Sequence, residues 1–363
     1  MLRTGYKFML VSLFSAMLFV LAAPELHAAS VTYIVGTCKV GTRFTKIQDA
    51  LNATPKPTIV EVCPGTYPEQ VTISGTVTVE GIVSGNSSFA TLVPPSGGLV
   101  TNTALLNGDP AAAQILIEDV SNPVNLTNLV VNGSGADVGG AAVVGILYRN
   151  TSGTINHVAT YNVSAGIGGY GIYLAGGAQN PKVTIQNSIF DHDQTGLWVQ
   201  SNSTSSELTA IVENNLVYFC ATCIDVEAGA TATISNNMIN TNGEIGIALS
   251  GSTGSVAGNT IVGGGQLGIA SGNDGFSITS NKIYDATVFG ILLDISTVTA
   301  NVTGNTLTNM AGAGIGFCGS PGTPSKVHSN TFVDGNIGYS APSGFAITGN
   351  TFIGVISDSE ACN

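Results

Sequence analysis

The chain contains 363 residues, of which only 9% are charged, and 22 acidic against 10 basic side chains give it a formal net charge of −12. Surfaces that follow nucleic-acid phosphates need clustered Lys and Arg, so this balance excludes nucleic acid as an expected partner. A polyanionic sugar would need a local basic site or bridging cations, because Arg43 and Arg149 are the only arginines after residue 30.

The first 29 residues have the composition of a secretory signal peptide. A basic start is followed by an uncharged run over residues 8–24 and by small residues at Ala28 and Ala29, a pattern typical of such peptides. An uncleaved membrane anchor is the alternative for this segment. No later segment has the roughly 20 apolar residues that a membrane span needs. We therefore expect a secreted or periplasmic protein without membrane contact once the signal is removed.

Residues 30–363 predict one elongated domain, because the repeat described below requires every coil to pack on its neighbours. Residues 44–53 place apolar side chains on one helical face, and we expect a short amphipathic helix that caps the open end of the solenoid. Residues 84–113 are rich in Pro and Gly, which predicts a strand pair with long loops in an oversized coil. Regular coils are expected over residues 115–356, with wider spacing and projecting loops over residues 133–178.

An asparagine recurs through these coils in the same short phrase, as in SNNMI, AGNTI and TGNTL, with steps of 22, 22, 22, 24, 25 and 20 residues. The repeating positions are Asn215, Asn237, Asn259, Asn281, Asn305, Asn330 and Asn350. Periods of roughly 20 to 50 residues indicate stacked supersecondary units, and short β-branched phrases between turn residues indicate strands. The sequence therefore predicts an all-β fold, the single-stranded parallel β-helix.

Alternation within each coil assigns the inward and outward positions. Most asparagine phrases are followed by Gly and an apolar residue, and this strand stacks Ile247, Ile269, Ile291 and Ile315 into an inward ladder. Inward asparagines at the turns would form a hydrogen-bonded ladder of amides. We expect all these repeating residues to be scaffold, and a functional site where unusual residues interrupt the repeat.

Two outward columns follow from aligning the coils on the Gly-Ile strand. The first column is Leu147, Tyr173, Trp198, Asp225, Ala248, Ala270, Leu292 and Gly316. The second column is Arg149, Ala175, Gln200, Glu227, Ser250, Gly272, Asp294 and Cys318. Adjacent coils lie about 4.8 Å apart, so one patch gathers the only Trp of the chain with aromatic, amide, acidic and basic side chains.

This patch predicts carbohydrate binding. An exposed aromatic plate at Tyr173 and Trp198 suits the C–H face of a sugar ring, and Gln200, Asp225 and Glu227 can hold its hydroxyls. The carboxylates of Asp225 and Glu227 are also candidate Ca²⁺ ligands, since Ca²⁺ prefers oxygen. Two other interpretations stay open. The residues could be ordinary cross-strand side-chain pairs that stabilise neighbouring strands, or the patch could be covered by a loop or another subunit.

Asp191, His192 and Asp193 form a turn directly before the Trp198 strand. A histidine between two carboxylates is a candidate acid or base, because the carboxylates can raise its pKa. Three consecutive side chains do not all point the same way, and Asp-rich turns are common. A solvated turn is therefore the alternative.

Six cysteines in an exported chain favour disulfides. We expect pairs between near neighbours. The expected pairs are Cys38 with Cys63, Cys220 with Cys223, and Cys318 with Cys362. A metal-binding or redox role for Cys220-Ala-Thr-Cys223 is the alternative.

The segment FTKIQDALNATPKPTIVEVCPGTYPEQVTISGTVTVEGI, residues 44–82, resembles the opening of the pectate-lyase-like superfamily. Exported proteins of that superfamily share the run F-x-x-I-Q-x-A followed by P-G-x-Y-x-E-x-V-x-I. The later coils resemble generic parallel β-helix repeats, so the resemblance covers nearly the whole mature chain. It implies a right-handed parallel β-helix, and it leaves the activity open because this fold hosts many functions.

The motif comparison selects no enzyme family. The Leu-Gly-Arg-Pro-Trp segment of pectin methylesterases is absent, as are the Gly-His-Gly and Arg-x-Lys of polygalacturonases. Pectate lyases need a basic residue beside Ca²⁺-binding acids, a role for which only Arg149 is suitably placed. Mannuronan epimerases use Tyr, His and acids around Asp-Pro-His, which Tyr173 and the Asp191–Asp193 turn resemble loosely, without the Pro.

Two hypotheses follow. The first is an exported β-helix protein that binds an extracellular polysaccharide and modifies it as a lyase or epimerase. His192 or Tyr173 would then be base or acid, and Arg149, or Ca²⁺ on Asp225 and Glu227, would neutralise the uronate carboxylate. The second is a non-catalytic surface, adhesion or structural solenoid. The sequence does not determine the glycan or the oligomeric state.

Overall fold

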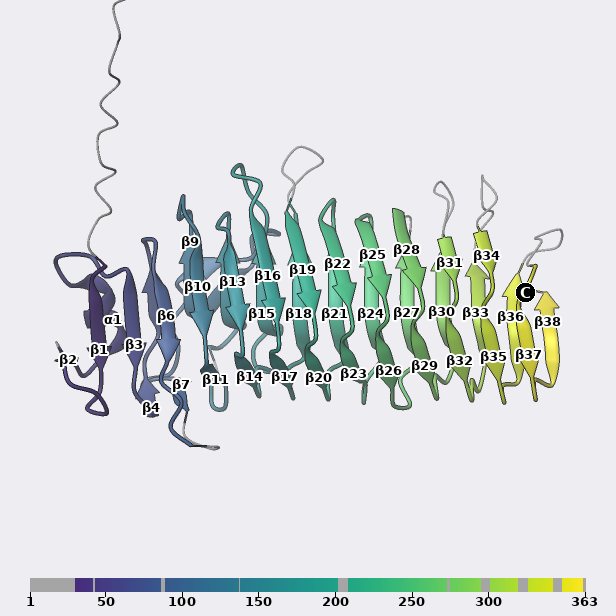
Figure 1. Ribbon diagram of the computed structural model, residues 1–363, viewed down its shortest axis with the longest axis horizontal. Coiled ribbons are helices and arrows are strands. Elements are labelled where there is room, and N and C mark those ends of the chain that lie inside the picture. Colours follow the sequence, from purple (N-terminus) through teal and green to yellow (C-terminus); the bar gives the residue numbers. More distant parts are fainter. Residues whose placement is uncertain are drawn as a thin grey trace, which may run out of the picture. The chain divides into compact units, whose positions relative to one another are not determined.

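Each coil of the chain contributes one short strand to each of three sheets, and the coils stack in a single row (Figure 1). The computed structural model describes residues 30–41, 43–85, 89–136, 138–201, 208–272, 275–294, 301–318, 326–341 and 348–361. The expected signal peptide lies outside the described residues. Within them, every strand pairing in the three sheets is parallel except that of β8 with β9.

Sheet A contains β1 (Thr32–Val35), β2 (Arg43–Phe44), β3 (Ile59–Val62), β6 (Thr78–Gly81), β10 (Val124–Thr127), β13 (Gly153–Asn156), β16 (Lys182–Gln186), β19 (Thr209–Glu213), β22 (Thr231–Ser235), β25 (Thr253–Ala257), β28 (Gly275–Thr279), β31 (Asn301–Thr303) and β34 (Lys326–His328). Sheet B contains β4 (Gly65–Pro68), β7 (Ala90–Val93), β11 (Leu129–Asn132), β14 (Ala159–Tyr161), β17 (Ile189–Asp191), β20 (Leu216–Tyr218), β23 (Met238–Asn240), β26 (Thr260–Val262), β29 (Lys282–Tyr284), β32 (Thr306–Thr308), β35 (Thr331–Val333) and β37 (Thr351–Ile353). Sheet C contains β5 (Val71–Ile73), β9 (Pro110–Glu118), β12 (Ala142–Arg149), β15 (Gly169–Ala175), β18 (Thr195–Gln200), β21 (Thr222–Glu227), β24 (Ile245–Ser250), β27 (Leu267–Gly272), β30 (Phe289–Asp294), β33 (Ala313–Cys318), β36 (Ile337–Ala341) and β38 (Ser357–Ala361), with β8 (Thr103–Ala104) beside β9.

The core lies inside the coils, where the inward residue of each strand packs on its equivalent in the next coil. The predicted ladder of Ile247, Ile269, Ile291 and Ile315 is confirmed: consecutive members are register partners and all four are fully buried. Burying one such side chain contributes roughly 1.5–3 kcal/mol. The repeat is therefore the physical cause of the solenoid, because each coil removes its neighbour's apolar face from water.

The asparagine ladder is also confirmed as scaffold. Each side-chain Nδ2 donates to Oδ1 of the asparagine one coil ahead, over 2.9 to 3.1 Å from Asn215 to Asn350. The same Oδ1 also accepts from the preceding asparagine's backbone N–H, and Asn259 Nδ2 further donates to the carbonyl of Ile234. Buried amides are stable only when paired, and here each one pairs with the next coil.

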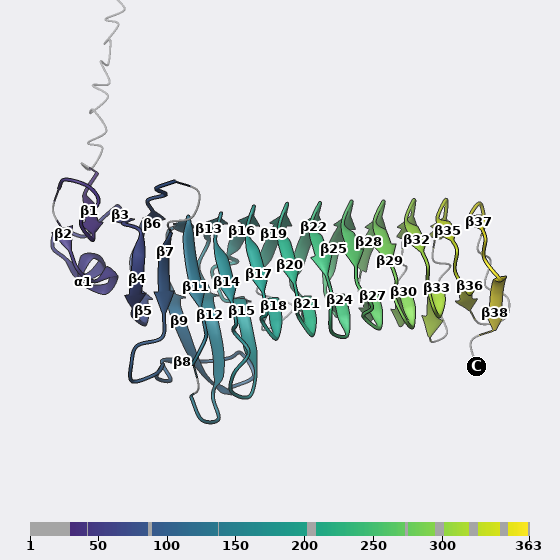
Figure 2. The ribbon, with the colours of Figure 1, turned by 90° about the horizontal axis from the view of Figure 1, so that it is seen from below.

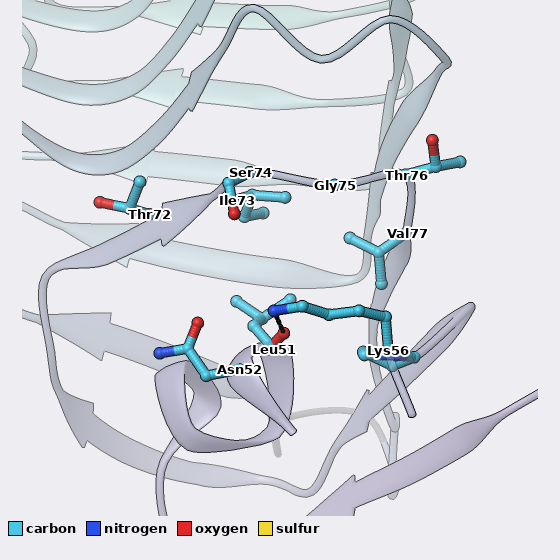
Figure 3. A pocket seen from close by; sticks show the side chains of 10 residues that line it. Leu51, Asn52, Lys56, Thr72, Ile73, Ser74, Gly75, Thr76 and Val77 are labelled. Atoms are coloured by element: carbon cyan, nitrogen blue, oxygen red, sulfur yellow. Dashed lines mark hydrogen bonds between the residues drawn. The ribbon is translucent and has the colours of Figure 1, made fainter. Parts of the chain in front are cut away.

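A short helix, α1 (Ile47–Asn52), packs against the first coils and buries three of its side chains. Glu69 binds its N-terminus, accepting from the backbone N–H groups of Ile47 at 2.9 Å and Gln48 at 3.1 Å. At the other end, Lys56 Nζ donates to the carbonyl of Leu51 beside a cavity of about 180 Å³ (Figure 3). The helix begins later than expected, because Arg43–Phe44 pairs with β1 as strand β2.

Residues 84–113 belong to one coil with a long connection between sheets B and C. They form β7, the short β8 and the start of β9, and β8 runs antiparallel to β9. The strands β9, β12 and β15 are long, and the solenoid is visibly thicker over β8–β15 than over the later coils (Figure 2). Leu105 and Leu106 of this segment pack on the outer face of sheet C. Residues 98–110 are called the cover segment below.

Two of the three expected disulfides are present. Cys38 bonds to Cys63 near the N-terminal end, and Cys220 bonds to Cys223 between sheets B and C. The third expected pair involves Cys362, which lies outside the described residues. In the part of the chain that the structure describes, no helix is long and apolar enough to cross a membrane.

Candidate functional site

The outward columns of sheet C have the predicted register. Trp198 pairs with Tyr173 in the preceding coil and with Asp225 in the following one, and Gln200 pairs with Glu227. The pairing continues without a slip through Ala248, Ala270, Leu292 and Gly316. The predicted residues therefore do meet on one face of the solenoid.

The expectation of an exposed aromatic plate is wrong. Trp198 is only 9% exposed and Tyr173 is fully buried. The physical reason is the cover segment, whose Leu105 and Leu106 pack on these rings together with Tyr170. Trp198 stacks on Tyr170 and on Tyr173, with ring centroids 4.7 and 4.8 Å apart. The aromatic residues therefore form a small second core outside the sheet, and Trp198 lies at its C-terminal edge.

Arg149 anchors the cover segment. Its Nη1 donates to Glu118 at 2.7 Å and to Thr103 Oγ1 at 2.9 Å, and its Nη2 donates to the carbonyl of Ala104. The side chain is 17% exposed. Arg149 was predicted to neutralise a substrate carboxylate. In the structure its guanidinium is already paired with Glu118 and holds β8 in place.

Tyr173 links the cover segment to the second outward column. Its hydroxyl accepts from the backbone N–H of Leu106 at 3.2 Å and donates to Gln200 Oε1 at 2.7 Å. Gln200 Nε2 then donates to Glu227 at 3.4 Å. Burial raises the pKa of Tyr173 to about 12, so the phenol stays protonated and acts as a donor rather than as a base.

Asp225 and Glu227 lie where the covered region ends. They occupy the same outward face of β21, two residues and about 6.6 Å apart along the strand. Burial, reinforced by the charge of Glu227, raises the pKa of Asp225 to about 7. The side chain of Asp225 makes no hydrogen bond to another described residue, and neither does the buried Nε1 of Trp198 on the neighbouring strand. The indole N–H is a buried group without a partner, which is uncommon in native structures, whereas Asp225 is half-buried and keeps access to water.

Beyond these carboxylates the outer face of sheet C becomes flat. The following positions in the two columns are small: Ala248 and Ser250, then Ala270 and Gly272. All four are at least partly exposed. An extended ligand on this surface would therefore meet the covered aromatic cluster at one end, with Asp225 and Glu227 at the junction.

His192 is not brought together with Tyr173. It lies in the turn between β17 and β18, where its Nδ1 is 2.6 Å from Asp191 Oδ1 and its ring is 4.6 Å from that of Phe219. Asp193 points the other way. It is buried and accepts from Thr160 Oγ1 at 2.6 Å and from the backbone N–H of Val163 at 2.9 Å.

Asp193 is a structural residue of the turn. Its hydrogen bonds favour the charged carboxylate, yet burial dominates and raises its pKa to about 7. Among the residues that the structure describes, no three His, Cys, Asp or Glu side chains group as a metal site. Asp225 and Glu227 together would supply only part of the six to eight oxygens that Ca²⁺ takes.

Comparison with known families now gives the class of the chain. A family model described as the right handed beta helix region matches residues 202–354, and the three stacked parallel sheets extend the same architecture from β1 to β38. The chain is a right-handed parallel β-helix protein. No curated protein matches it significantly.

Solved structures similar to this β-helix protein have different functions. One is a lacto-N-biosidase of Eubacterium ramulus, with a TM-score of 0.57, 9% identity, and coverage of 93% of this chain and 68% of the enzyme. Another is PfbA, a surface adhesin of Streptococcus pneumoniae, with a TM-score of 0.51, 14% identity, and coverage of 87% and 88%. The match to the mannuronan C-5 epimerase AlgE4 A-module of Azotobacter vinelandii covers 86% of this chain and 92% of the module at 14% identity. Its TM-score is only 0.46, so nothing is inferred from it. These likenesses show the fold alone.

Reasoning from the sequence missed two exposed or half-exposed aromatics of this β-helix protein. Tyr170 was in neither predicted column. It directly precedes the Gly-Ile pair of its coil and so belongs to a third outward column. Phe219 follows β20 in the turn to sheet C and is 42% exposed. Aligning the coils on the residue after each sheet B strand would have found Phe219 as an outlier.

Proposed function

We propose that this β-helix protein binds a neutral polysaccharide on the outer face of sheet C and that Asp225 and Glu227 cleave it by acid–base chemistry. The observation that carries the proposal is the pair of half-buried carboxyl groups, Asp225 and Glu227, on the same outward face of β21 where the covered cluster ends. Their oxygens can accept hydrogen bonds from the hydroxyl groups of a sugar that lies on this face.

The pKa of Asp225, about 7, suits a general acid at neutral pH, because about half of the molecules then carry the proton. Asp225 would give this proton to the glycosidic oxygen as the bond to the anomeric carbon breaks. Glu227, held by Gln200, would assist attack at that carbon, either by taking a proton from water or as the nucleophile. The anomeric configuration of the first product distinguishes these two roles.

The charges at the site favour a neutral sugar. A uronate placed there would meet the two carboxylates of β21, and the nearest guanidinium, that of Arg149, is already paired with Glu118. The earlier lyase or epimerase hypothesis needs His192 or Tyr173 as base and Arg149 as the neutralising cation. His192 lies apart from Tyr173, in the turn between β17 and β18, and the Arg149 guanidinium is occupied by Glu118, so the structure does not support that arrangement.

The two disulfides support export. Disulfides persist in oxidising compartments, so Cys38–Cys63 and Cys220–Cys223 fit a secreted or periplasmic protein that meets extracellular glycans. The fold itself does not choose between an enzyme and a structural solenoid, since its structural neighbours include both an enzyme and an adhesin. A non-catalytic solenoid is therefore the second candidate, and the repetitive strip from Ala248 to Gly272 is the feature that favours it.

The test is turnover of defined glycans by the purified mature protein. Neutral polysaccharides such as xylan, mixed-linkage glucan and galactomannan are compared with alginate and polygalacturonate, and new reducing ends are measured. We expect cleavage of a neutral glycan, and a rate that falls 10²- to 10⁴-fold in Asp225→Asn and in Glu227→Gln, the range typical of removing a general acid or base.

Asp294→Asn is the matched control, because Asp294 lies in the same outward column as Glu227, three coils further along. Its rate should equal that of the wild type. No turnover of any glycan, or equal turnover in Asp225→Asn, would reject the enzyme and leave the solenoid. Release of unsaturated uronates from alginate or polygalacturonate would restore the lyase hypothesis instead.

A further inference from the structure

The turn from sheet B to sheet C holds one residue in the left-handed backbone conformation in most coils. The residues with this conformation directly after a sheet B strand are Asn162 (φ 58°), His192 (56°), Phe219 (51°), Gly263 (98°), Asp285 (61°), Asn309 (58°), Asp334 (51°) and Gly354 (66°). Asn, Asp, His and Gly adopt this conformation more readily than other residues, whereas another bulky side chain is an outlier there. Phe219 is the exception in this column.

Phe219 combines this strain with exposure. A left-handed conformation costs a bulky residue on the order of 1–3 kcal/mol, and a phenyl ring that stays partly in water offsets only part of that cost through burial. The ring is 42% exposed and lies against His192, with centroids 4.6 Å apart. Strained residues that persist without a packing reason concentrate at functional sites.

A hollow of about 310 Å³ opens beside these two rings. Its remaining lining comes from Cys220, Ala221, Asn242 and Gly243. The floor is fixed, because Cys220 is buried and disulfide-bonded to Cys223. A rigid floor, an exposed aromatic wall and a few polar groups are the usual elements of a small-ligand site.

The polar groups at its rim suit hydroxyls rather than ions. Asp191, which precedes His192 and is not itself part of the lining, holds the His192 ring through one carboxylate oxygen, and its side chain makes no other hydrogen bond to a described residue. Asn242 likewise has no hydrogen-bond partner in the described part of the chain. A carboxylate and an amide beside an aromatic face can hold adjacent hydroxyls of a pyranose whose C–H face lies on the ring.

We propose that Phe219, His192, Asp191 and Asn242 form a second carbohydrate-binding site that takes one hexopyranose residue of a neutral glycan. The site lies at the B–C turn and uses none of the residues assigned to cleavage. It goes beyond the proposed function, because it anchors the glycan whether or not the protein cleaves it. An aromatic side chain of a peptide would use the ring but not the carboxylate and the amide, so the glycan is the favoured ligand.

The decisive variant is Phe219→Asn. Asn occupies the same turn position at Asn162 and Asn309 with the same backbone conformation, so the substitution removes the ring while relieving the strain. We expect unchanged or raised thermal stability together with a loss of affinity of at least 10-fold. Asn309→Gly, at the equivalent position of another coil, is the control and should bind as the wild type does.

Binding is measured by affinity electrophoresis of the full mature chain in gels that contain xylan, mixed-linkage glucan or galactomannan, with an aromatic peptide as the competitor. Each variant is also made in the Asp225→Asn background, so that binding is read without turnover. Glycan retention that is lost in Phe219→Asn supports the site even if no glycan is cleaved, and this outcome separates it from the proposed function. Retention that is equal in Phe219→Asn and wild type, or displacement by the peptide alone, overturns it.

Discussion

The outer face of sheet C is built in two ways along one solenoid. Over β9 to β18 it carries Leu147, Tyr173 and Trp198 under the cover segment, fixed by Arg149. Over β24 and β27 the same columns hold the small residues Ala248, Ser250, Ala270 and Gly272, and β30 then places Leu292 and Asp294 in them. The inward ladder is the same in both regions. The comparison shows that inward positions maintain the fold and leave the outward ones free to specialise.

The junction between the two regions is where Trp198, with its buried unpaired indole N–H, pairs in register with Asp225. The covered side excludes water from Trp198 and raises the pKa of Asp225, while the flat side leaves room for an extended ligand. Each of the following changes tests whether the two regions differ as described.

The largest stability effect is expected in the regular region, from Asn259→Ala. It leaves the Asn237 backbone N–H, the Asn237 Nδ2 and the Ile234 carbonyl without their partner, and each unmatched buried group costs about 1–3 kcal/mol. We expect a loss of about 3–6 kcal/mol in the free energy of unfolding, from urea denaturation followed by circular dichroism. Asn350→Ala, at the half-buried end of the ladder, should lose only about 1 kcal/mol. Equal losses would contradict the ladder.

The next effect tests the junction through its pH dependence. The folded pKa of Asp225 is about 7, against a usual 3.8. Because it is raised, the neutral carboxyl stabilises the fold below about pH 4, and this contribution is lost as the pH rises through 7. Asp225→Asn should therefore be more stable than the wild type at pH 8, by at most roughly 4 kcal/mol, with the difference vanishing at pH 4. Asp193 titrates in both proteins alike, so the comparison cancels it.

Melting temperatures at pH 4, 6 and 8 measure this difference. Asp294→Asn, on the flat region, serves again as the control. A wild type that is more stable than Asp225→Asn at pH 8 would show that Asp225 is charged and paired, in contrast to the geometry described.

The covered region is tested by Arg149→Ala. The change removes the bonds to Glu118, Thr103 and Ala104 that hold β8, and we expect a loss of about 2–3 kcal/mol, as for a partly buried charged hydrogen bond. The fluorescence of Trp198, the only tryptophan, should shift to longer wavelength as the cover loosens. An unchanged spectrum would mean that the cover segment is held by its leucines alone.

The smallest effect is expected from Lys39→Ala. Lys39 pairs with Glu61 at 2.6 Å, but its side chain is 54% exposed, and such surface pairs contribute about 0–1 kcal/mol. The same denaturation experiment should find less than half of the loss seen for Arg149→Ala. A comparable loss would remove the distinction between the covered and the exposed ion pair.

The fold and its register were predictable because they depend on short-range periodicity. The 22-residue step, the alternation around Ile247 and the near spacing of Cys220 and Cys223 are all visible in the chain itself. Even the pairing of Trp198 with Asp225 follows from counting residues after each Gly-Ile pair.

The surroundings of the candidate site could not be predicted in the same way. Leu105 and Leu106 lie in a segment without periodicity, so nothing local indicates that it folds back over Tyr173. The burial of Trp198 and the occupation of Arg149 both result from that one long-range contact. Phe219, in contrast, was detectable, because it is the one phenylalanine at a turn position that otherwise holds Asn, Asp, Gly or His192 in the left-handed conformation.

The asparagine ladder also makes the length of this protein adjustable. Asn237 bonds to Asn259 in the same way that Asn259 bonds to Asn281, so the coil between them is an interchangeable module. Removing residues 238–259 would bring Asn237 against Asn281 and shorten the stack by one spacing, about 4.8 Å. Insertion of a coil would lengthen it by the same step. Evolution or design can therefore set the reach of the flat strip in whole-coil increments, while the helix at one end and the carboxylates of β21 stay where they are.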